Sequence, residues 1–192
     1  LDNKGRKQVY SVEFKTIKDI PQQTLNEIIQ EDYNTPKEIV EELHQRIKLR
    51  VGGSPTAQVR DSMDLGLFSY NEQTQEVRFV GTHTSIYRVR NSKLEKFKGS
   101  KADIGYKPSI AIEEQVFQVE TNDMLYMHSD GYPDQKGGPK GKKFYYQPIR
   151  TKLEEISLLN LMEQEQIMNQ TFEDWKGEIE QLDDVCMLGV RL

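Results

Sequence analysis

The sequence predicts an α+β domain in which antiparallel hairpins lie between two helical regions. Three observations lead to this fold class. A helical pattern with a capping box begins at residue 35, segments with a two-residue period run from residue 63 to residue 130, and a second helical region covers residues 153–175. Because turn signatures separate the strands and the helices are grouped before and after them, antiparallel layers are favoured over a doubly wound parallel sheet.

The amino-terminal elements are a strand and a helix. Residues 7–14, KQVYSVEF, alternate apolar and polar side chains, which is typical of a strand with one buried face. Thr35 is the expected cap of the following helix, Pro36 suits its first position and Glu38 completes a capping box. Behind this start, an apolar stripe recurs every four residues and is expected to face a core. It consists of Ile39, Leu43 and Ile47.

Three hairpins are expected in the middle of the chain, each with a polar turn between two strands of period two. They join residues 63–70 to 76–80, 85–90 to 94–97, and 115–120 to 124–130. The stretch from Leu153 to Trp175 is predicted to be mostly helical, and VCMLGVRL at residues 185–192 is predicted to be a closing strand.

Composition narrows the classes of function. The chain has 192 residues, enough for one domain with its own core. A formal net charge of -5 argues against a protein that binds nucleic acid through a basic face. Cys186 is the single cysteine, so a disulfide framework is excluded, and we expect it to be a small core residue in a reducing cytoplasm. No apolar run reaches the roughly 18 residues of a membrane span, so no direct membrane contact is expected.

Acidic residues lie at the ends of two predicted strands. Asp130 follows the strand MLYMH, and Asp183 and Asp184 precede the closing strand. If the two strands are antiparallel neighbours, these carboxylates converge at one edge of the sheet. Clustered carboxylates repel each other unless a cation lies between them, and Mg²⁺ and Mn²⁺ prefer oxygen ligands. Gly131 allows a sharp turn there, although taken singly such short motifs are more often a turn and a solvated cap.

Longer segments, in a fixed order, carry a resemblance to a known family. They are DSMDLGL (61–67), VGTHTSIYRVRNSKL (80–94), ADIGY (102–106), NDMLYMHSDGYPDQKGGPKGKKF (122–144) and FEDWKGEIEQLDDVCMLGVRL (172–192). Together they resemble the SpoIIE branch of the PPM metal-dependent protein phosphatases, especially the bacterial members attached to sensor domains. The segment from Leu25 to Leu43 is similar to the helical region that precedes them in that family.

The resemblance implies an αββα sandwich of two antiparallel sheets flanked by helices, with residues 1–192 as a single phosphatase domain of a larger signalling protein. It also implies a two-metal centre of Mn²⁺ or Mg²⁺. Asp130 and Asp183 match catalytic metal ligands of the family. Gly131 and Asp184, which stand beside them in the two motifs, are expected to belong to the same metal site. Asp64 matches a further acid whose role is less defined.

The implied reaction is hydrolysis of phosphoserine or phosphothreonine on a protein by a metal-activated water, without a phosphoenzyme. By family analogy, the substrate is a phosphorylated regulatory protein of the anti-sigma-factor antagonist type. The domain is expected in the bacterial cytoplasm, with an amino-terminal sensor domain that tethers it to a membrane in some arrangements. Nucleic acid is not an expected partner.

The family pattern is incomplete in this chain. A GD motif would lie before Leu1, and a glycine-rich segment with an aspartate is missing between Phe14 and Leu25. Three explanations remain open: the chain is a fragment, a mobile loop is missing from this sequence, or the protein is a degenerate relative. The alternative function is therefore a catalytically impaired module of the same fold that binds a signalling partner. Asp2 and Asp19 could substitute for the missing aspartates, but Asp2 is more typical of a turn residue and Asp19 of an exposed residue.

Two further groups of side chains lie near the acids or in the helices. The loop after Asp130 is rich in lysine and glycine, and it is either a substrate-binding surface for a phosphorylated segment or a solvated loop. Its lysines are Lys136, Lys140, Lys142 and Lys143. His44 is expected on the surface of a helix, and His128 lies either near a metal ligand or at an exposed edge.

Overall fold

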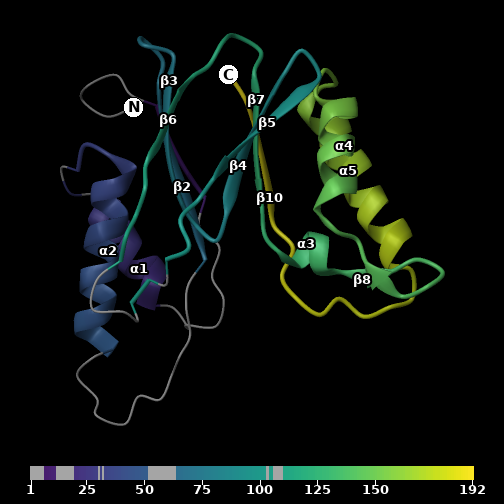
Figure 1. Ribbon diagram of the computed structural model, residues 1–192, viewed down its shortest axis with the longest axis horizontal. Helices are drawn as coiled ribbons and strands as arrows, with labels where there is room; N and C mark the ends of the chain where they lie inside the picture. Colours follow the sequence, from purple (N-terminus) through teal and green to yellow (C-terminus); the bar gives the residue numbers. More distant parts are fainter. Residues whose placement is uncertain are drawn as a thin grey trace. The chain divides into compact units, whose positions relative to one another are not determined.

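The computed structural model describes residues 7–11, 20–29, 31, 33–51, 64–102, 104–105 and 110–192 (Figure 1). The chain divides into two compact units. The first consists of Leu1–Ile86 and Phe97–Val119, and the second consists of Tyr87–Lys96 and Glu120–Leu192. Each unit is built around one four-stranded antiparallel sheet with helices packed against it.

The first unit contains the sheet with strand order β1-β2-β3-β6. Its strands are β1 (Lys7–Ser11), β2 (Leu65–Asn71), β3 (Glu76–Thr82) and β6 (Gln115–Gln118). Helices α1 (Ile20–Ile29) and α2 (Pro36–Val51) belong to the same unit. The predicted apolar stripe of α2 is fully buried and packs with residues of the two central strands. The cluster includes Ile39, Leu43, Ile47, Leu65, Leu67 and Val80.

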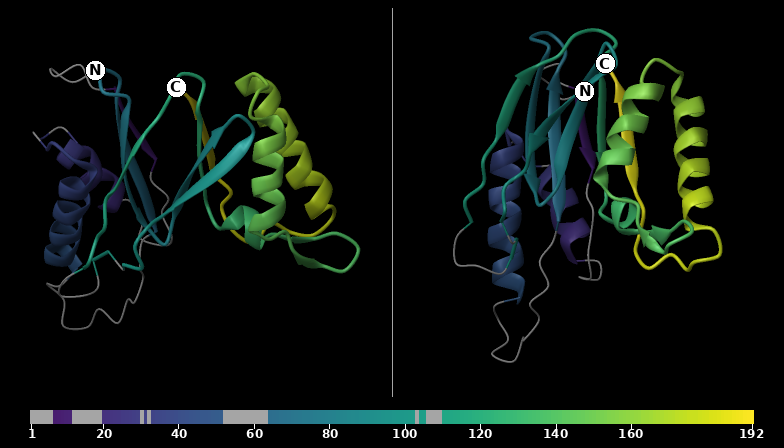
Figure 2. Two further views of the ribbon diagram at one scale, coloured as in Figure 1. Left: turned by 45° about the horizontal axis from the view of Figure 1, so that its top comes forward. Right: turned by 45° about the vertical axis from the view of Figure 1, so that its right-hand side comes forward.

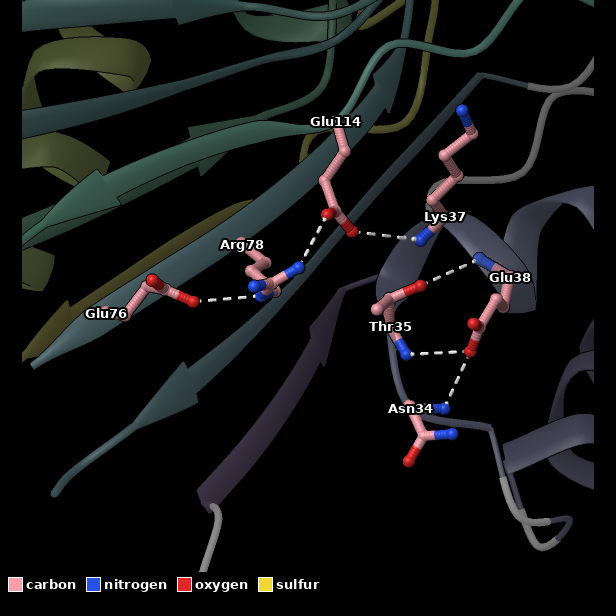
Figure 3. A network of polar contacts seen from close by, with 7 residues as sticks. All are labelled: Asn34, Thr35, Lys37, Glu38, Glu76, Arg78 and Glu114. Atoms are coloured by element: carbon pink, nitrogen blue, oxygen red, sulfur yellow. Dashed lines mark hydrogen bonds and ion pairs between the residues drawn. The ribbon is translucent and has the colours of Figure 1, made fainter. Parts of the chain in front are cut away.

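The start of α2 has the predicted capping box, and Figure 3 shows its contacts. The Glu38 N–H donates to Thr35 Oγ1 at 3.2 Å, and the Thr35 N–H donates to Glu38 Oε2 at 3.1 Å. Glu114 connects this helix end to the sheet. Its carboxylate accepts from the Lys37 N–H at 3.4 Å and pairs with Arg78 of β3 at 3.1 Å. The cap and the ion pair together fix α2 on the sheet of the first unit.

The second unit contains the sheet with strand order β10-β7-β4-β5. Its strands are β4 (Ser85–Arg90), β5 (Lys93–Lys98), β7 (Met124–His128) and β10 (Met187–Arg191). Between β7 and β10 the chain forms α3 (Gly131–Asp134), the short strands β8 (Lys136–Gly137) and β9 (Lys142–Lys143), α4 (Tyr146–Ile156) and α5 (Leu161–Lys176). Figure 2 shows α4 and α5 lying side by side. The core between them and the sheet includes Tyr87, Tyr126, Ile149, Leu153, Met168 and Phe172.

The third predicted hairpin is wrong, whereas the first two are confirmed as β2–β3 and β4–β5. Strand β6 pairs with β3, and β7 pairs with β10 and β4 in the other sheet. The turn between β6 and β7 is held by long-range contacts instead of by a strand partner. The buried carboxylate of Asp123 binds Arg90 of β4 at 2.8 Å and 2.6 Å, and the Asn122 N–H donates to the Leu192 carbonyl at 2.7 Å.

The predicted helical stretch 153–175 is two helices. Asn160 begins α5 with a second capping box, since its side chain accepts from the Glu163 N–H at 2.9 Å and the Glu163 carboxylate accepts from the Asn160 N–H at 3.2 Å. The predicted strand 7–14 is described as β1 up to Ser11, and its remaining residues lie outside the described part. Among the described helices, none combines the length and the apolarity that a membrane span requires.

Candidate functional site

The two acidic motifs, SDG (Ser129, Asp130 and Gly131) and DD (Asp183 and Asp184), lie at the same edge of one sheet. Strands β7 and β10 are antiparallel neighbours, and His128 at the end of β7 pairs with Met187 at the start of β10. The residues that follow β7 therefore lie beside the residues that precede β10. The pairing of β7 with β10 is the strand arrangement on which the prediction for Asp130, Asp183 and Asp184 depends.

Ser129 joins the two motifs through three hydrogen bonds. Its N–H donates to the Cys186 carbonyl at 2.9 Å, and its hydroxyl donates to the Asp184 carbonyl at 2.9 Å. The same hydroxyl oxygen accepts from the Cys186 N–H at 2.9 Å. Ser129 is 2% exposed, so these bonds form away from solvent and fix the main chains of the two motifs against each other.

Gly131 allows this close approach. A Cβ atom at this position would overlap the main-chain carbonyl of Asp184, although nothing in the φ angle of Gly131 excludes other residues. The glycine of the SDG segment is therefore required for space. It is also the first residue of α3, and the Asp134 N–H donates to the Asp130 carbonyl at 3.0 Å at the other end of this single turn.

The carboxylates at this edge differ in exposure. Asp130 precedes α3, is half-buried and has its Oδ1 atom removed from solvent. Asp183 and Asp184 are exposed, and Asp183 Oδ1 accepts from the Asp184 N–H at 2.9 Å. Among the described residues, no group of three or more histidine, cysteine or acidic side chains is arranged to hold a metal ion. Asp64 is half-buried just before β2 in the first unit.

His128 packs beside the acidic edge. Its ring stacks on Tyr87 with 5.5 Å between ring centres, and its Nδ1 lies 2.8 Å from the Ser129 carbonyl. A carbonyl accepts only, so Nδ1 carries the proton of that bond. Burial is the main cause that lowers the pKa of His128, and the charges of Lys96 and Arg150 lower it further. The imidazole is therefore held in its neutral form at pH 7.

The lysine-rich loop is a short hairpin, β8–β9, that is fixed to α5. The Gly138 N–H donates to the Trp175 carbonyl at 2.8 Å, and the Trp175 indole N–H donates to the Gln135 carbonyl at 3.0 Å. Its four lysines are exposed, as the sequence indicated, and Lys143 pairs with Asp134 at 2.8 Å. The lysines thus project from a hairpin that follows α3 and is anchored to α5.

Two sequence-based expectations about polar residues are wrong. His44 is 1% exposed, and its Nδ1 accepts from the Gly105 N–H at 3.0 Å, a distant partner that leaves no local signal in the sequence. Cys186 is exposed, because Val185 and Met187 on either side of it pack on the core and turn its side chain to the opposite face. Ser129 was not singled out, although the segment SDG contains it.

Comparisons with known proteins address the fold. Residues 21–192 match the sequence model of the family described as Stage II sporulation protein E (SpoIIE). The SiaA-PP2C domain of Pseudomonas aeruginosa is similar, with a TM-score of 0.80 and 22% identity over 90% of this chain and 68% of that chain. A search of curated protein sequences finds no match.

Two other solved structures are also similar. The PP2C phosphatase domain with a fragment of the regulatory domain of SpoIIE from Bacillus subtilis gives a TM-score of 0.68 at 17% identity, over 90% of this chain and 48% of that chain. The serine/threonine phosphatase PstP/Ppp of Mycobacterium tuberculosis gives a TM-score of 0.60 at 10% identity, over 97% of this chain and 98% of that chain. The chain thus spans about half of the SpoIIE structure. At these identities the similarity shows the fold alone. It confirms the predicted fold class of this chain, an α+β fold like that of the PPM phosphatase domains.

Proposed function

Because the chain belongs to the SpoIIE family of PP2C-type phosphatase domains, we propose that it is a metal-dependent protein phosphatase. It hydrolyses phosphoserine or phosphothreonine on a bacterial regulatory protein. The observation that carries this proposal is the Ser129 hydroxyl, which bonds the Asp184 carbonyl and the Cys186 N–H on either side of Val185 and so holds the SDG and DD motifs together.

The acidic edge has the chemistry that Mn²⁺ or Mg²⁺ requires. Asp130, Asp183 and Asp184 offer only oxygen donors, and Mg²⁺ is commonly held by one or two carboxylates with water and substrate phosphate completing its shell. We assign Asp130 and Asp183 as metal ligands, with Asp184 and the main chain of Gly131 beside them. When bound, such cations supply Lewis acidity and a water of lowered pKa.

The chain's own residues prepare this edge for a charged ligand. Ser129 and Gly131 fix the spacing between the main chains of the two motifs from which Asp130 and Asp183 project. The buried Oδ1 of Asp130 is shielded from water, which strengthens its attraction for a cation. The neutral His128 adds no positive charge that would compete with the cation.

The substrate we propose is a phosphorylated regulatory protein, with an antagonist of an anti-sigma factor as the expected type. The regulatory context of one similar protein, which is described as a cell fate determinant, supports this class. A sensor domain elsewhere in the full-length protein would control the activity. The exposed lysines of the β8–β9 hairpin would attract the phosphorylated segment to the otherwise acidic edge.

Hydrolysis of p-nitrophenyl phosphate and of a phosphoserine protein tests the proposal. We expect turnover that requires Mn²⁺ or Mg²⁺ and falls by at least about 100-fold in Asp130→Asn and Asp183→Asn, since metals supply several kcal/mol of transition-state stabilisation. Asp134→Asn is the matched control, because Asp134 is an exposed carboxylate on α3 that pairs with Lys143. Metal-independent turnover, or equal loss in Asp134→Asn with the fold intact, would contradict the proposal.

The role of the lysine hairpin needs its own measurement. Replacing Lys136, Lys140, Lys142 and Lys143 with serine should lower kcat/KM for the phosphoprotein about tenfold at low salt, because steering by exposed charges is screened as ionic strength rises. Turnover of p-nitrophenyl phosphate should change little. Serine at Lys152 and Lys176, which lie on α4 and α5, serves as the control for lost charge. An unchanged kcat/KM for the phosphoprotein at low salt would contradict this role of the four lysines.

A further inference from the structure

Strand β10 has an open edge. It pairs with β7 on one side, and among the described strands none lies against its other side. The Leu192 N–H donates to the Asp123 carbonyl at 3.0 Å, so the even-numbered residues at this end of the chain face β7. Because the two sides alternate along an antiparallel strand, the main-chain groups of Met187, Gly189 and Arg191 point to the open edge. Such an edge can pair with a further extended segment.

A cavity of about 540 Å³ lies between this edge and α5. Its lining includes Tyr126, Met168 and Phe172, which belong to the core of the second unit. The Tyr126 hydroxyl already donates to Gln164 Oε1 at 2.7 Å, so its ring contributes apolar surface. Because Gly189 has no side chain, β10 leaves space over this ring, from which a Cβ atom would be 3.4 Å away. The cavity therefore offers an apolar floor beside the open edge.

The wall formed by α5 and the segment after it is acidic. From Leu161 to Asp184 the only cationic residue is Lys176, and it pairs with Glu173 at 2.8 Å. Further carboxylates on this stretch are exposed, namely Glu163, Glu165, Asp174, Glu178 and Glu180. Glu165 lines the cavity itself. An occupant with lysine or arginine side chains therefore complements the charge of this wall.

The cavity continues to the DD motif. Gln181 and Val185 line it, and they stand on either side of Asp183 and Asp184 in the chain. The Gln181 side chain donates to the Asp183 carbonyl at 2.9 Å, which ties the cavity wall to the motif. A polypeptide that follows β10 away from the acidic edge therefore enters this cavity.

We propose that the groove between α5 and β10 binds the segment of the phosphoprotein substrate that precedes its phosphorylated residue, an inference that rests on the proposed function. The segment adds to β10 as an antiparallel strand, like both pairings of β7 in this sheet. Because β10 runs away from the acidic edge, an antiparallel segment runs toward it and carries the phosphorylated residue at its carboxyl end. Apolar side chains of the segment cover the floor, and basic ones face the acidic wall.

Turnover of phosphoserine peptides by the full-length protein with Mn²⁺ tests this assignment. One peptide carries about five residues of alternating valine and lysine before the phosphoserine, enough to span β10, and a second carries the same residues after it. We expect a KM about tenfold lower for the first peptide, with kcat unchanged, since only its segment is bound in the groove. N-methylation at alternate positions should raise that KM about tenfold in one of the two registers only, because it removes main-chain hydrogen bonds to the edge.

A charge reversal on the wall gives a matched pair of variants. Glu165→Lys should raise the KM of the first peptide about fivefold at low salt and leave turnover of p-nitrophenyl phosphate unchanged. Asp174→Lys makes the same change of charge on the opposite side of α5 and should leave both unchanged. Equal KM values for the two peptides, or equal effects of the two variants, would overturn the proposal.

Hydrogen exchange examines the edge without turnover. In the free protein, the N–H groups of Met187, Gly189 and Arg191 should exchange rapidly, and the first peptide should protect them. Protection before peptide is added would mean that another segment of the same polypeptide fills the groove, and protection that grows with protein concentration would mean that a second copy does. Either result would overturn the proposal. If hydrolysis of p-nitrophenyl phosphate requires metal but the peptide protects none of these groups, the docking fails alone, whereas metal-independent hydrolysis contradicts the proposed function.

Discussion

At the residue scale, Gly131 sets how closely the SDG and DD motifs approach. The position of a Cβ atom is occupied by the Asp184 carbonyl, and Val185 Cγ2 would lie 3.3 Å away. Neither neighbour is the far end of a long flexible side chain, so the contact cannot be relieved by a rotamer change alone. Alanine therefore has to push the two motifs apart.

We expect Gly131→Ala to destabilise the protein by about 1–3 kcal/mol, the usual cost of overpacking, and to abolish metal-dependent turnover. Urea denaturation followed by circular dichroism measures the first effect, and hydrolysis of p-nitrophenyl phosphate measures the second. Gly189→Ala on β10 is the control, since its Cβ would meet Tyr126 at 3.4 Å, an ordinary contact. Equal stability of Gly131→Ala and the wild type would show that the motifs are not in contact as described.

At the element scale, the turn between β6 and β7 decides which sheet each strand joins. Asp123 is 2% exposed, and its carboxylate receives two hydrogen bonds from Arg90 and one from the Glu120 N–H at 2.9 Å. A buried carboxylate with a two-point guanidinium partner is strongly destabilised when that partner is removed, because the charge stays behind without compensation.

Arg90→Met should therefore lower the free energy of unfolding by about 3–5 kcal/mol. Lys152→Met, which breaks a surface pair with Glu155, should cost at most about 1 kcal/mol. A double-mutant cycle with Asp123→Asn, followed by urea denaturation, measures the coupling between the two side chains. The double mutant should lose less stability than the sum of the losses in the two single mutants. Strict additivity would mean that Arg90 stabilises the turn without acting through Asp123.

The same turn explains where sequence patterns suffice and where they do not. The capping box at Thr35 and Glu38 and the stripe behind it are local, so the start and the buried face of α2 could be predicted. The residues at 121–123 also indicate a turn, but the choice of strand partners depends on Arg90, 33 positions away. The start of α5 is an intermediate case, because the capping box of Asn160 with Glu163 was present in the sequence and was overlooked.

The candidate site divides in the same way. The adjacency of Asp130 to Asp183 and Asp184 follows from the order of strands, since an antiparallel pair brings the end of β7 beside the start of β10. The contribution of Ser129 depends on register, because its hydroxyl reaches the main chain on both sides of Val185 only when His128 faces Met187. The burial of His44 depends on Gly105, 61 residues away, and no periodicity encodes such a contact.

At the scale of the whole molecule, the proposed cations connect stability to function. The DD motif follows α5 and the SDG motif follows β7, so a cation held by both would close the long segment that contains α3, α4 and α5. A ligand that binds only the folded chain stabilises it by mass action, by about 2.7 kcal/mol when its concentration is 100 times its Kd. The acidic edge should be stabilised most by the cation, because the cation removes the repulsion among its carboxylates.

Addition of Mn²⁺ should therefore raise the Tm of the wild-type protein, and removal with EDTA should reverse the rise. In Asp130→Asn and Asp183→Asn the rise should be largely lost, even though the metal-free Tm of these variants should equal or exceed that of the wild type, since each removes one repelling charge. Asp174→Asn, on the exposed face of α5, should retain the full rise. Differential scanning fluorimetry at several Mn²⁺ concentrations separates these cases, because a site elsewhere would stabilise Asp130→Asn as much as the wild type.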